Sequence, residues 1–213
     1  MKNIAILGAG GHGHEVAFLI EAINFQLPTW NIIGFFDDAH EALDRDASHY
    51  PTLGSIEAAK LLPKNTSLAI GIGAGSTRRR LIEALAIPGE RYPALVHPSV
   101  FTHKSIQLNN GALIFAGTTL TVNISLGRHC HINQGCTLSH GTILEDYATL
   151  SPGCHVAGDC LIEKGATLGM GVNTNQGLVI GTKTIVGSGA TVVSNLPPDV
   201  IAIGTPAKAI RKG

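Results

Sequence analysis

The second half of the chain carries four histidines whose imidazoles are able to act as bases or as metal ligands: His129, His131, His140 and His155. Imidazole is the side chain that most readily exchanges a proton near neutral pH, and it is also the commonest zinc ligand. No CxxC or HxxxH motif accompanies these histidines. We therefore expect no metal site. A solvated surface side chain is another interpretation of His140.

A glycine-rich stretch near the N-terminus is the second group of residues suited to chemistry. Gly8, Gly10 and Gly13 match the pattern GxGxxG between an apolar segment and a helical one. Backbone N–H groups in such a turn, with the N-terminus of the following helix, bind phosphate. Asp37 and Asp38 close the next strand, where a carboxylate accepts hydrogen bonds from ribose hydroxyls. The alternatives are a glycine turn that only packs helix against strand and an ordinary turn at the aspartates.

The element that positions the histidines follows from a repeat of six residues. Between Leu108 and Val192 an aliphatic residue recurs at every sixth position, and only Thr174 interrupts the series. Small residues recur two positions earlier. Two inward registers with this period predict a left-handed parallel β-helix, whose triangular coil contains eighteen residues in three short strands. Because no two of the four histidines are eighteen residues apart, they do not stack as metal ligands on neighbouring coils.

All four cysteines fall on the small inward register of the repeat: Cys130, Cys136, Cys154 and Cys160. Cys136 and Cys154 are eighteen residues apart, so a spacing of about 4.8 Å between coils makes a disulfide conceivable. Thiols stay reduced in the cytoplasm. We therefore favour free, buried thiols that pack as small apolar groups.

Residues 1–97 alternate instead between apolar strands and helical stretches, as in a small parallel α/β domain. Strands are expected at 4–7, 32–36, 68–72 and 94–96, and helices at 14–23, 55–62 and 77–86. Four strands supply little more than half of a dinucleotide-binding sheet, so a phosphorylated ligand other than NAD is favoured. Pro93 and Pro98 mark the change from the α/β pattern to the six-residue repeat. We predict an α/β domain at 1–97, a β-helix at 98–195 and a C-terminal tail at 196–213.

The composition narrows the class of protein. Fifteen basic residues balance fifteen acidic ones, so there is no electrostatic footprint for nucleic acid or an anionic membrane. The apolar run at the N-terminus ends at Leu7, before a signal peptide is complete, and no apolar stretch of about 18 residues follows that spans a bilayer. We expect a cytoplasmic protein.

Several motifs, in this order, resemble one known family. They are GAGGHG at the N-terminus, FFDD at the end of the second strand, YPALVHPS at the junction, LSHGT around His140, HVAGDC after it and GTPAKAIR near the C-terminus. With the β-helix, they resemble the bacterial sugar O-acyltransferase family of hexapeptide-repeat proteins. That family includes sialic acid O-acetyltransferases and nucleotide-4-amino-sugar N-acetyltransferases. The resemblance covers essentially the whole chain.

The resemblance implies a homotrimer with acetyl-coenzyme A between neighbouring β-helices and a nucleotide sugar on the N-terminal domain. His140 stands at the position of the general base, a role that typically contributes roughly 10²- to 10⁴-fold to the rate. The positions that match the coenzyme A groove are Thr149, Gly158, Met170 and Ser188. The positions that match the nucleotide-sugar site are Gly10, Gly11, His12, Asp37 and Asp38.

The chain departs from the N-acetyltransferase branch at two positions. An acidic residue follows the catalytic histidine in that branch, whereas Gly141 follows His140 here. Asp159 lies one coil beyond Gly141, and we expect its carboxylate to orient His140 instead. Thr149 replaces a second histidine that lies near the thioester in that branch. His131, one coil earlier on the same face, is either its substitute or a surface residue.

The expected function is acetyl-coenzyme A-dependent N-acetylation of a nucleotide-linked 4-amino-4,6-dideoxy sugar in bacterial glycan biosynthesis, with His140 as base. The nearest alternative is O-acetylation of sialic acid or a related sugar. A non-catalytic trimeric scaffold that binds nucleotides is an alternative of another class, and a dehydrogenase with a trimerising tail is a third.

Overall fold

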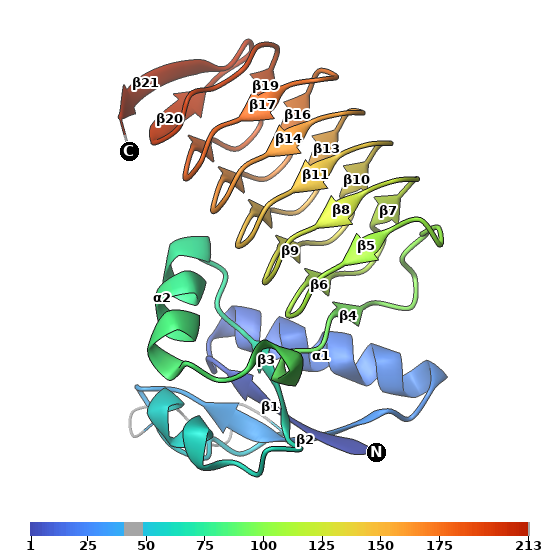
Figure 1. Cartoon of the computed structure of the whole chain (residues 1–213), viewed down its shortest axis with the longest axis vertical. Coiled ribbons are helices and arrows are strands. Elements are labelled where there is room, and N and C mark those ends of the chain that lie inside the picture. Colours follow the sequence, from blue (N-terminus) through green and yellow to red (C-terminus); the bar gives the residue numbers. More distant parts are fainter. Residues whose placement is uncertain (41–48, 213) are drawn as a thin grey trace.

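The computed structural model of the chain describes residues 1–40 and 49–212. In Figure 1 an α/β domain lies below a tall solenoid of stacked coils, and the chain runs from the first to the second. The expected fold class is confirmed: an α/β domain is followed by a left-handed parallel β-helix.

The α/β domain has a three-stranded parallel sheet in the order β2-β1-β3. Its strands are β1 (Lys2–Leu7), β2 (Trp30–Phe36) and β3 (Ser67–Ile70). Helix α1 (Gly11–Gln26) packs on one face of the sheet, while α2 (Gly75–Leu85) and the 3-10 helix η1 (Ile56–Leu61) pack on the other. The short 3-10 helix η2 (Gly89–Arg91) follows α2. Because helices cover both faces, the buried part of β1 is a continuous apolar run with no polar alternation.

The helix expected at residues 55–62 is present as the 3-10 helix η1. One expectation for this domain was wrong. The expected fourth strand, β4 (Leu95–Val96), pairs with β6 (Leu113–Ile114) of the solenoid and not with β1–β3. Val96 is twelve residues before Leu108, so it already belongs to the six-residue series. The domain boundary between residues 97 and 98 stays a prediction.

The solenoid consists of three sheets that form the sides of a prism, and their strands are parallel except for the last one, β21. The first sheet contains β4, β6, β9 (His131–Ile132), β12 (Thr149–Leu150), β15 (Thr167–Leu168), β18 (Ile185–Val186), β20 (Val200–Ile203) and β21 (Lys208–Lys212). The second contains β7 (Thr119–Leu120), β10 (Thr137–Leu138), β13 (His155–Val156), β16 (Asn173–Thr174) and β19 (Thr191–Val192). The third contains β5 (Gln107–Leu108), β8 (Ser125–Leu126), β11 (Ile143–Leu144), β14 (Leu161–Ile162) and β17 (Val179–Ile180).

Residues eighteen apart lie side by side on neighbouring coils, as Thr137 and His155 do. The aliphatic member of each strand and the small residues two positions before it fill the core, and all four cysteines are buried there and free. The free thiols expected from the sequence are therefore confirmed. Among the described residues, no cluster of three or more His, Cys, Asp or Glu side chains is placed to hold a metal ion, and no helix is long and apolar enough to cross a membrane.

The prism has three edges, which we name after a residue on each. The His140 edge joins the second sheet to the third, the Tyr147 edge joins the third to the first, and the Met170 edge joins the first to the second. From β5 to β19, each turn at an edge contains a residue with positive φ, usually glycine. At the His140 edge these residues are Asn123, Gly141, Asp159 and Gly177, at φ 55°, 68°, 58° and 72°. A non-glycine residue at such a φ is uncommon, and Asn and Asp are the types that tolerate it best.

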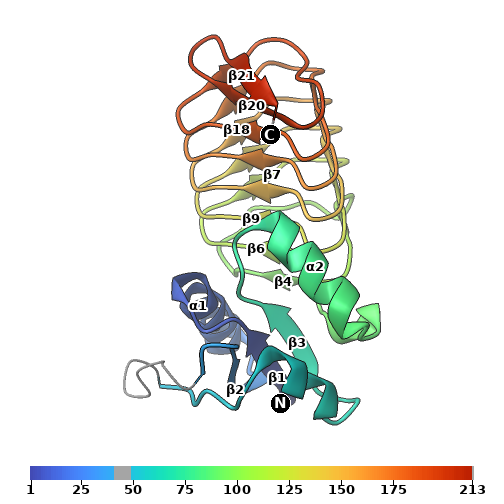
Figure 2. The ribbon, with the colours of Figure 1, turned by 90° about the vertical axis from the view of Figure 1, so that its left-hand side faces the viewer.

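The α/β domain packs against the first sheet near its N-terminal end. Leu95, Leu113 and Phe115 of the solenoid share a core with α1, so this helix lies between its own sheet and the first coils. Figure 2 shows α2 in front of the first coils and α1 below them. At the other end, β20 pairs with β18, and β21 returns antiparallel to β20. The C-terminal tail expected from the sequence therefore extends the first sheet as a hairpin.

Candidate active site

His140 and Asp159 lie together on the His140 edge of the solenoid. Nδ1 of His140 is 3.5 Å from Oδ1 of Asp159, and both side chains are about half exposed, at 55% and 54%. The backbone N–H of Asp159 also donates to the carbonyl of His140 at 2.8 Å. Since Asp159 contacts Nδ1, the second ring nitrogen, Nε2, is left for an exposed partner. An imidazole in this arrangement is able to accept a proton at Nε2.

Two glycines make room for this pair. A Cβ on Gly158 would overlap Cε1, Nε2 and Nδ1 of His140, because the imidazole lies directly over this glycine. A Cβ on Gly141 would overlap Oδ1 of Asp159. The carboxylate of Asp159 therefore occupies the space that a side chain at position 141 would enter.

Gln176 is a further member of this group, which the sequence analysis missed. Its Nε2 donates to Oδ2 of Asp159 at 2.9 Å, so the carboxylate is held between His140 on one coil and Gln176 two coils later. Gln176 is 17 residues after Asp159. A search for polar residues one coil, plus or minus one position, from Asp159 would have found it.

The residues matched to the coenzyme A groove do not lie at one place in a single chain. Gly158 is on the His140 edge, whereas Met170 and Ser188 are on the Met170 edge, eighteen residues apart and both exposed. Thr149 lies in β12 of the first sheet and is only 6% exposed. Its hydroxyl accepts a hydrogen bond of 2.8 Å from Nη2 of Arg78. The second sheet separates the two edges.

The glycine loop after β1 divides into packing glycines and open ones. A Cβ on Gly13 would overlap the carbonyl of Gly8, and Gly8 has φ 102°, so these two glycines let α1 approach the sheet. A Cβ on Gly10 or Gly11 would meet nothing within 4 Å. The interpretation of the motif as a packing turn therefore accounts for Gly8 and Gly13 but leaves Gly10 and Gly11 facing open space at the start of α1.

Asp37 and Asp38 hold the backbone around this loop. Oδ2 of Asp37 accepts from the N–H of Ala9 at 2.8 Å, and Oδ1 accepts from Ala39 at 2.9 Å. Oδ1 of Asp38 accepts from the N–H of Ile56 at 3.0 Å. The two carboxylates thus fix the loops beside the glycines, and each carboxylate oxygen retains a lone pair for a ligand.

His12 points away from the glycine loop and toward the solenoid. Its Nδ1 contacts Oε2 of Glu15 at 2.8 Å, and its Nε2 is 3.1 Å from Nδ1 of His131. His131 has no exposed surface, and burial holds its pKa well below the usual value, with the charges of Arg78 and His12 as further causes. The interpretation of His131 as a surface residue is therefore wrong.

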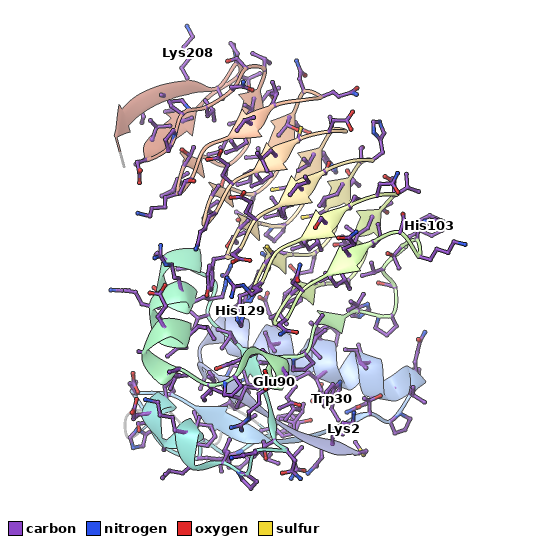
Figure 3. The ribbon with its side chains drawn as sticks, in the orientation of Figure 1. Lys2, Trp30, Glu90, His103, His129 and Lys208 are labelled. Carbon is purple, nitrogen blue, oxygen red and sulfur yellow. The ribbon has the colours of Figure 1, made fainter. Side chains whose placement is uncertain are left out.

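Arg78 connects the two domains at the same junction. This buried guanidinium donates to the carbonyls of His129 at 3.2 Å and Tyr147 at 3.1 Å, as well as to Thr149. On its own side it donates to the carbonyl of Ile72 at 3.1 Å. Burial lowers its pKa to about 10, so it stays charged at neutral pH. Figure 3 shows His129 between α2 and the first coils.

Comparison with known proteins agrees with this architecture. The family model of the PglD N-terminal domain matches residues 3–85. The UDP-N-acetylbacillosamine N-acetyltransferase of Bacillus subtilis (strain 168) is 32% identical over 118 residues, which are 54% of this chain and 52% of the relative. The chain thus spans about half the length of this curated relative.

Two of the solved structures that match over nearly the whole chain contain ligands. The acetyltransferase domain of PglB from Neisseria gonorrhoeae FA1090, in complex with acetyl coenzyme A, has a TM-score of 0.89 at 26% identity and covers 98% of this chain and 99% of its own. PerB from Caulobacter crescentus, in complex with CoA and GDP-perosamine, has a TM-score of 0.86 at 28% identity, with 98% and 97% covered. Over nearly its whole length, the chain is therefore similar to these two proteins, as the resemblance to the hexapeptide-repeat sugar acyltransferases implies.

The His140 edge and the glycine loop are two separate regions of this chain. His140, Asp159 and Gly158 are on one edge of the prism. Gly10 and Gly11 are on the α/β domain, at the first turn of α1. The roles of these residues remain predictions.

Proposed function

We propose that this acyltransferase transfers the acetyl group of acetyl-coenzyme A to the amine of a nucleotide-linked 4-amino-4,6-dideoxy sugar in bacterial glycan biosynthesis. The observation that carries the proposal is the exposed imidazole of His140, 3.5 Å from the carboxylate of Asp159 on a solenoid edge. The structure of PglB contains acetyl coenzyme A, which supports the proposed acyl donor. The structure of PerB contains GDP-perosamine, which supports a nucleotide sugar as the proposed acceptor.

In this proposal His140 is the general base and Asp159 its positioning residue. With Nδ1 protonated and facing Asp159, Nε2 takes a proton from the sugar amine as its nitrogen attacks the thioester carbonyl. A C–N bond forms, the C–S bond breaks, and coenzyme A leaves as the thiol after receiving a proton. An oxyanion develops in this step and needs a preorganised donor. In the described part of the chain, the backbone N–H of Gly158 has no acceptor, and we assign it this role.

We further propose a homotrimer with its active sites between subunits. Gly158 is on the His140 edge, but Met170 and Ser188 are on the Met170 edge of the same prism. A groove lined by Gly158 and also by Met170 and Ser188 requires that the Met170 edge of one subunit lies beside the His140 edge of another. Repeating that head-to-tail contact around a three-fold axis closes a ring. The stacked pair Met170 and Ser188 then forms a strip parallel to the solenoid axis, which suits the extended chain of coenzyme A.

The nucleotide of the acceptor is assigned to the first turn of α1. The helix has no capping side chain at Gly10 and no acidic residue in its first turn, so its N–H groups are available to phosphate. Asp37 and Asp38 end the neighbouring strand, where the remaining lone pairs accept from ribose or base. His12 belongs to this site only if it turns from His131 on binding. The cytoplasm is the compartment that we propose for the reaction.

Thiol release from acetyl-coenzyme A tests this function directly. The acceptors are UDP-, dTDP- and GDP-linked 4-amino sugars, with free and CMP-linked sialic acid as the O-acetylation arm, and the proteins are the wild type and His140→Ala. We expect turnover with an amino sugar that falls by roughly 10²- to 10⁴-fold in the variant. Turnover with sialic acid alone would replace the proposal by O-acetylation. Equal rates in both proteins would remove His140 from the mechanism.

A further inference from the structure

The Tyr147 edge contains a cavity that takes no part in the function proposed above. Its volume is ≈ 610 Å³, and it lies between α2 and the coils of the solenoid. The helix and the residue before it contribute Ala74, Gly75, Ser76, Arg79, Arg80 and Glu83, and the solenoid contributes Tyr147, Lys164, Gly165, Thr167, Thr182, Lys183 and Ile185. Residues of both domains therefore form its walls.

Positive charge dominates this cavity. Arg79, Arg80, Lys164 and Lys183 line it, against the single carboxylate of Glu83, which pairs with Arg79 at 2.8 Å. Nζ of Lys164 lies 6.0 Å from the centre of the Tyr147 ring. Within residues 1–40 and 49–212, no carboxylate forms an ion pair with Arg80, Lys164 or Lys183.

Three carboxylates on the neighbouring coils have other partners than the side chains of the cavity cations. Oε2 of Glu163 accepts from the N–H and the hydroxyl of Thr182, at 2.7 and 2.9 Å. Asp146 forms an ion pair with Arg128 at 2.6 Å, and Oε2 of Glu145 accepts from the backbone N–H of Lys164 at 2.9 Å. None of these three carboxylates forms a salt bridge with a cation that lines the cavity.

The N-terminus of α2 adds a further set of donors. The helix contains 11 residues, has no capping side chain and carries no acidic residue in its first turn. Gly75 packs against the carbonyl of Tyr147 so closely that a Cβ would overlap it. Buried Arg78 holds the same turn against the solenoid. The helix terminus is thus fixed at the cavity wall, where its N–H groups and dipole favour an anion.

We propose that this cavity binds a phosphate-bearing anion of the nucleoside diphosphate class. Lys164, Lys183 and Arg80 pair with the phosphates, together with the first turn of α2. The apolar part of the wall, Tyr147 and Ile185, contacts the nucleoside. The site lies on a different edge from His140 and from Met170, so its occupation does not depend on acetyl transfer. Because the ligand would contact both α2 and the coils, it would also hold the two domains together.

The experiment is residue-resolved lysine acetylation of the full chain by an N-hydroxysuccinimide ester, read by mass spectrometry with and without ADP. We expect ADP to slow labelling of Lys164 and Lys183 but not of the exposed lysines Lys64 and Lys104. In Arg80→Gln the ADP concentration that protects Lys183 should rise roughly tenfold, as for loss of a charge-assisted contact. The matched control Lys64→Ala/Lys104→Ala should leave that concentration unchanged.

Inorganic pyrophosphate is the second probe, because it separates phosphate from nucleoside recognition. If pyrophosphate protects Lys164 and Lys183 at the same concentration as ADP, the binding affinity comes from the cations and the N-terminus of α2. If pyrophosphate protects them less well than ADP, Tyr147 and Ile185 also contribute to the affinity by contacting the nucleoside. Unchanged labelling of Lys164 and Lys183 at millimolar ADP and pyrophosphate would overturn the proposal. Since labelling is read without any acceptor sugar, this result is independent of whether thiol release is observed.

Discussion

The carboxylate of Asp159 fills the space beside Gly141, and its Oδ1 lies 3.5 Å from Nδ1 of His140. Asp159 occupies the same turn position as Gly141, one coil later, and both residues have positive φ. The two positions are therefore alternatives for placing a carboxylate beside the imidazole, since a side chain at 141 would collide with the one at 159.

Asp159→Asn should lower kcat for thiol release. A neutral amide is a weaker partner than a carboxylate for Nδ1 of His140, so the imidazole is less firmly oriented. The loss of activity should be smaller than the roughly 10²- to 10⁴-fold loss on removing the base itself. A kcat equal to that of the wild type would show that Asp159 does not act on His140.

Gly141→Asp should impair the enzyme, and the exchange Gly141→Asp/Asp159→Gly should restore part of the activity. The single variant places a side chain against the Asp159 carboxylate and adds a like charge. The double variant removes the steric overlap and the charge repulsion, and it places a carboxylate on the residue after His140. The measurement is kcat for both variants. Activity in the double variant no higher than in Gly141→Asp would contradict the exchange of positions.

Gly158→Ala should displace the imidazole of His140 without unfolding the protein. The new methyl group would overlap three ring atoms, so the side chain must leave its position over the coil. We expect a fall in kcat that approaches the His140→Ala value, with an unchanged thermal midpoint. Gly73→Ala is the control, because a Cβ there meets nothing within 4 Å. Full activity of Gly158→Ala would mean that the ring position over Gly158 is not the productive one.

Arg78→Met should destabilise the junction between the domains. The change leaves buried carbonyls of His129 and Tyr147 without their donor, and each buried acceptor left unsatisfied costs about 1–3 kcal/mol. Arg79→Met is the control, since its pair with Glu83 is exposed to solvent and contributes little to stability. Urea unfolding measures both. Equal effects of the two substitutions would exclude Arg78 as the main contact between the domains.

Stability should decrease as the pH falls below about 6.5, through His129. Burial, with the charges of Arg78 and Arg128, lowers the pKa of His129 to about 4. The unfolded chain therefore binds this proton at a higher pH than the native protein, and about 3 kcal/mol is lost progressively between the unfolded and the native pKa. His129→Asn, which suits the φ of 56° at this position, should flatten the slope of unfolding free energy against pH. An unaltered slope would assign the effect to other groups.

The sequence predicted most of the elements because their signals are local. The six-residue series determines which side chains face the solenoid core, and it places His140 and Asp159 on neighbouring coils by counting alone. The same count would have assigned β4 to the solenoid, since Val96 continues the series. Gln176 was missed because its link to Asp159 depends on a side-chain conformation, which the register does not specify.

The six-residue repeat is therefore enough to predict the β-helix, its edges and the spacing of His140, Gly141 and Asp159, because a repeat of fixed period converts separation in sequence into position in space. How the α/β domain meets the solenoid is seen only in the folded structure. His12 contacts His131 across 119 residues, and Arg78 reaches Tyr147 across 69. Such contacts depend on how the surfaces of two separately folded domains fit together. A repeat within one domain carries no information about that fit.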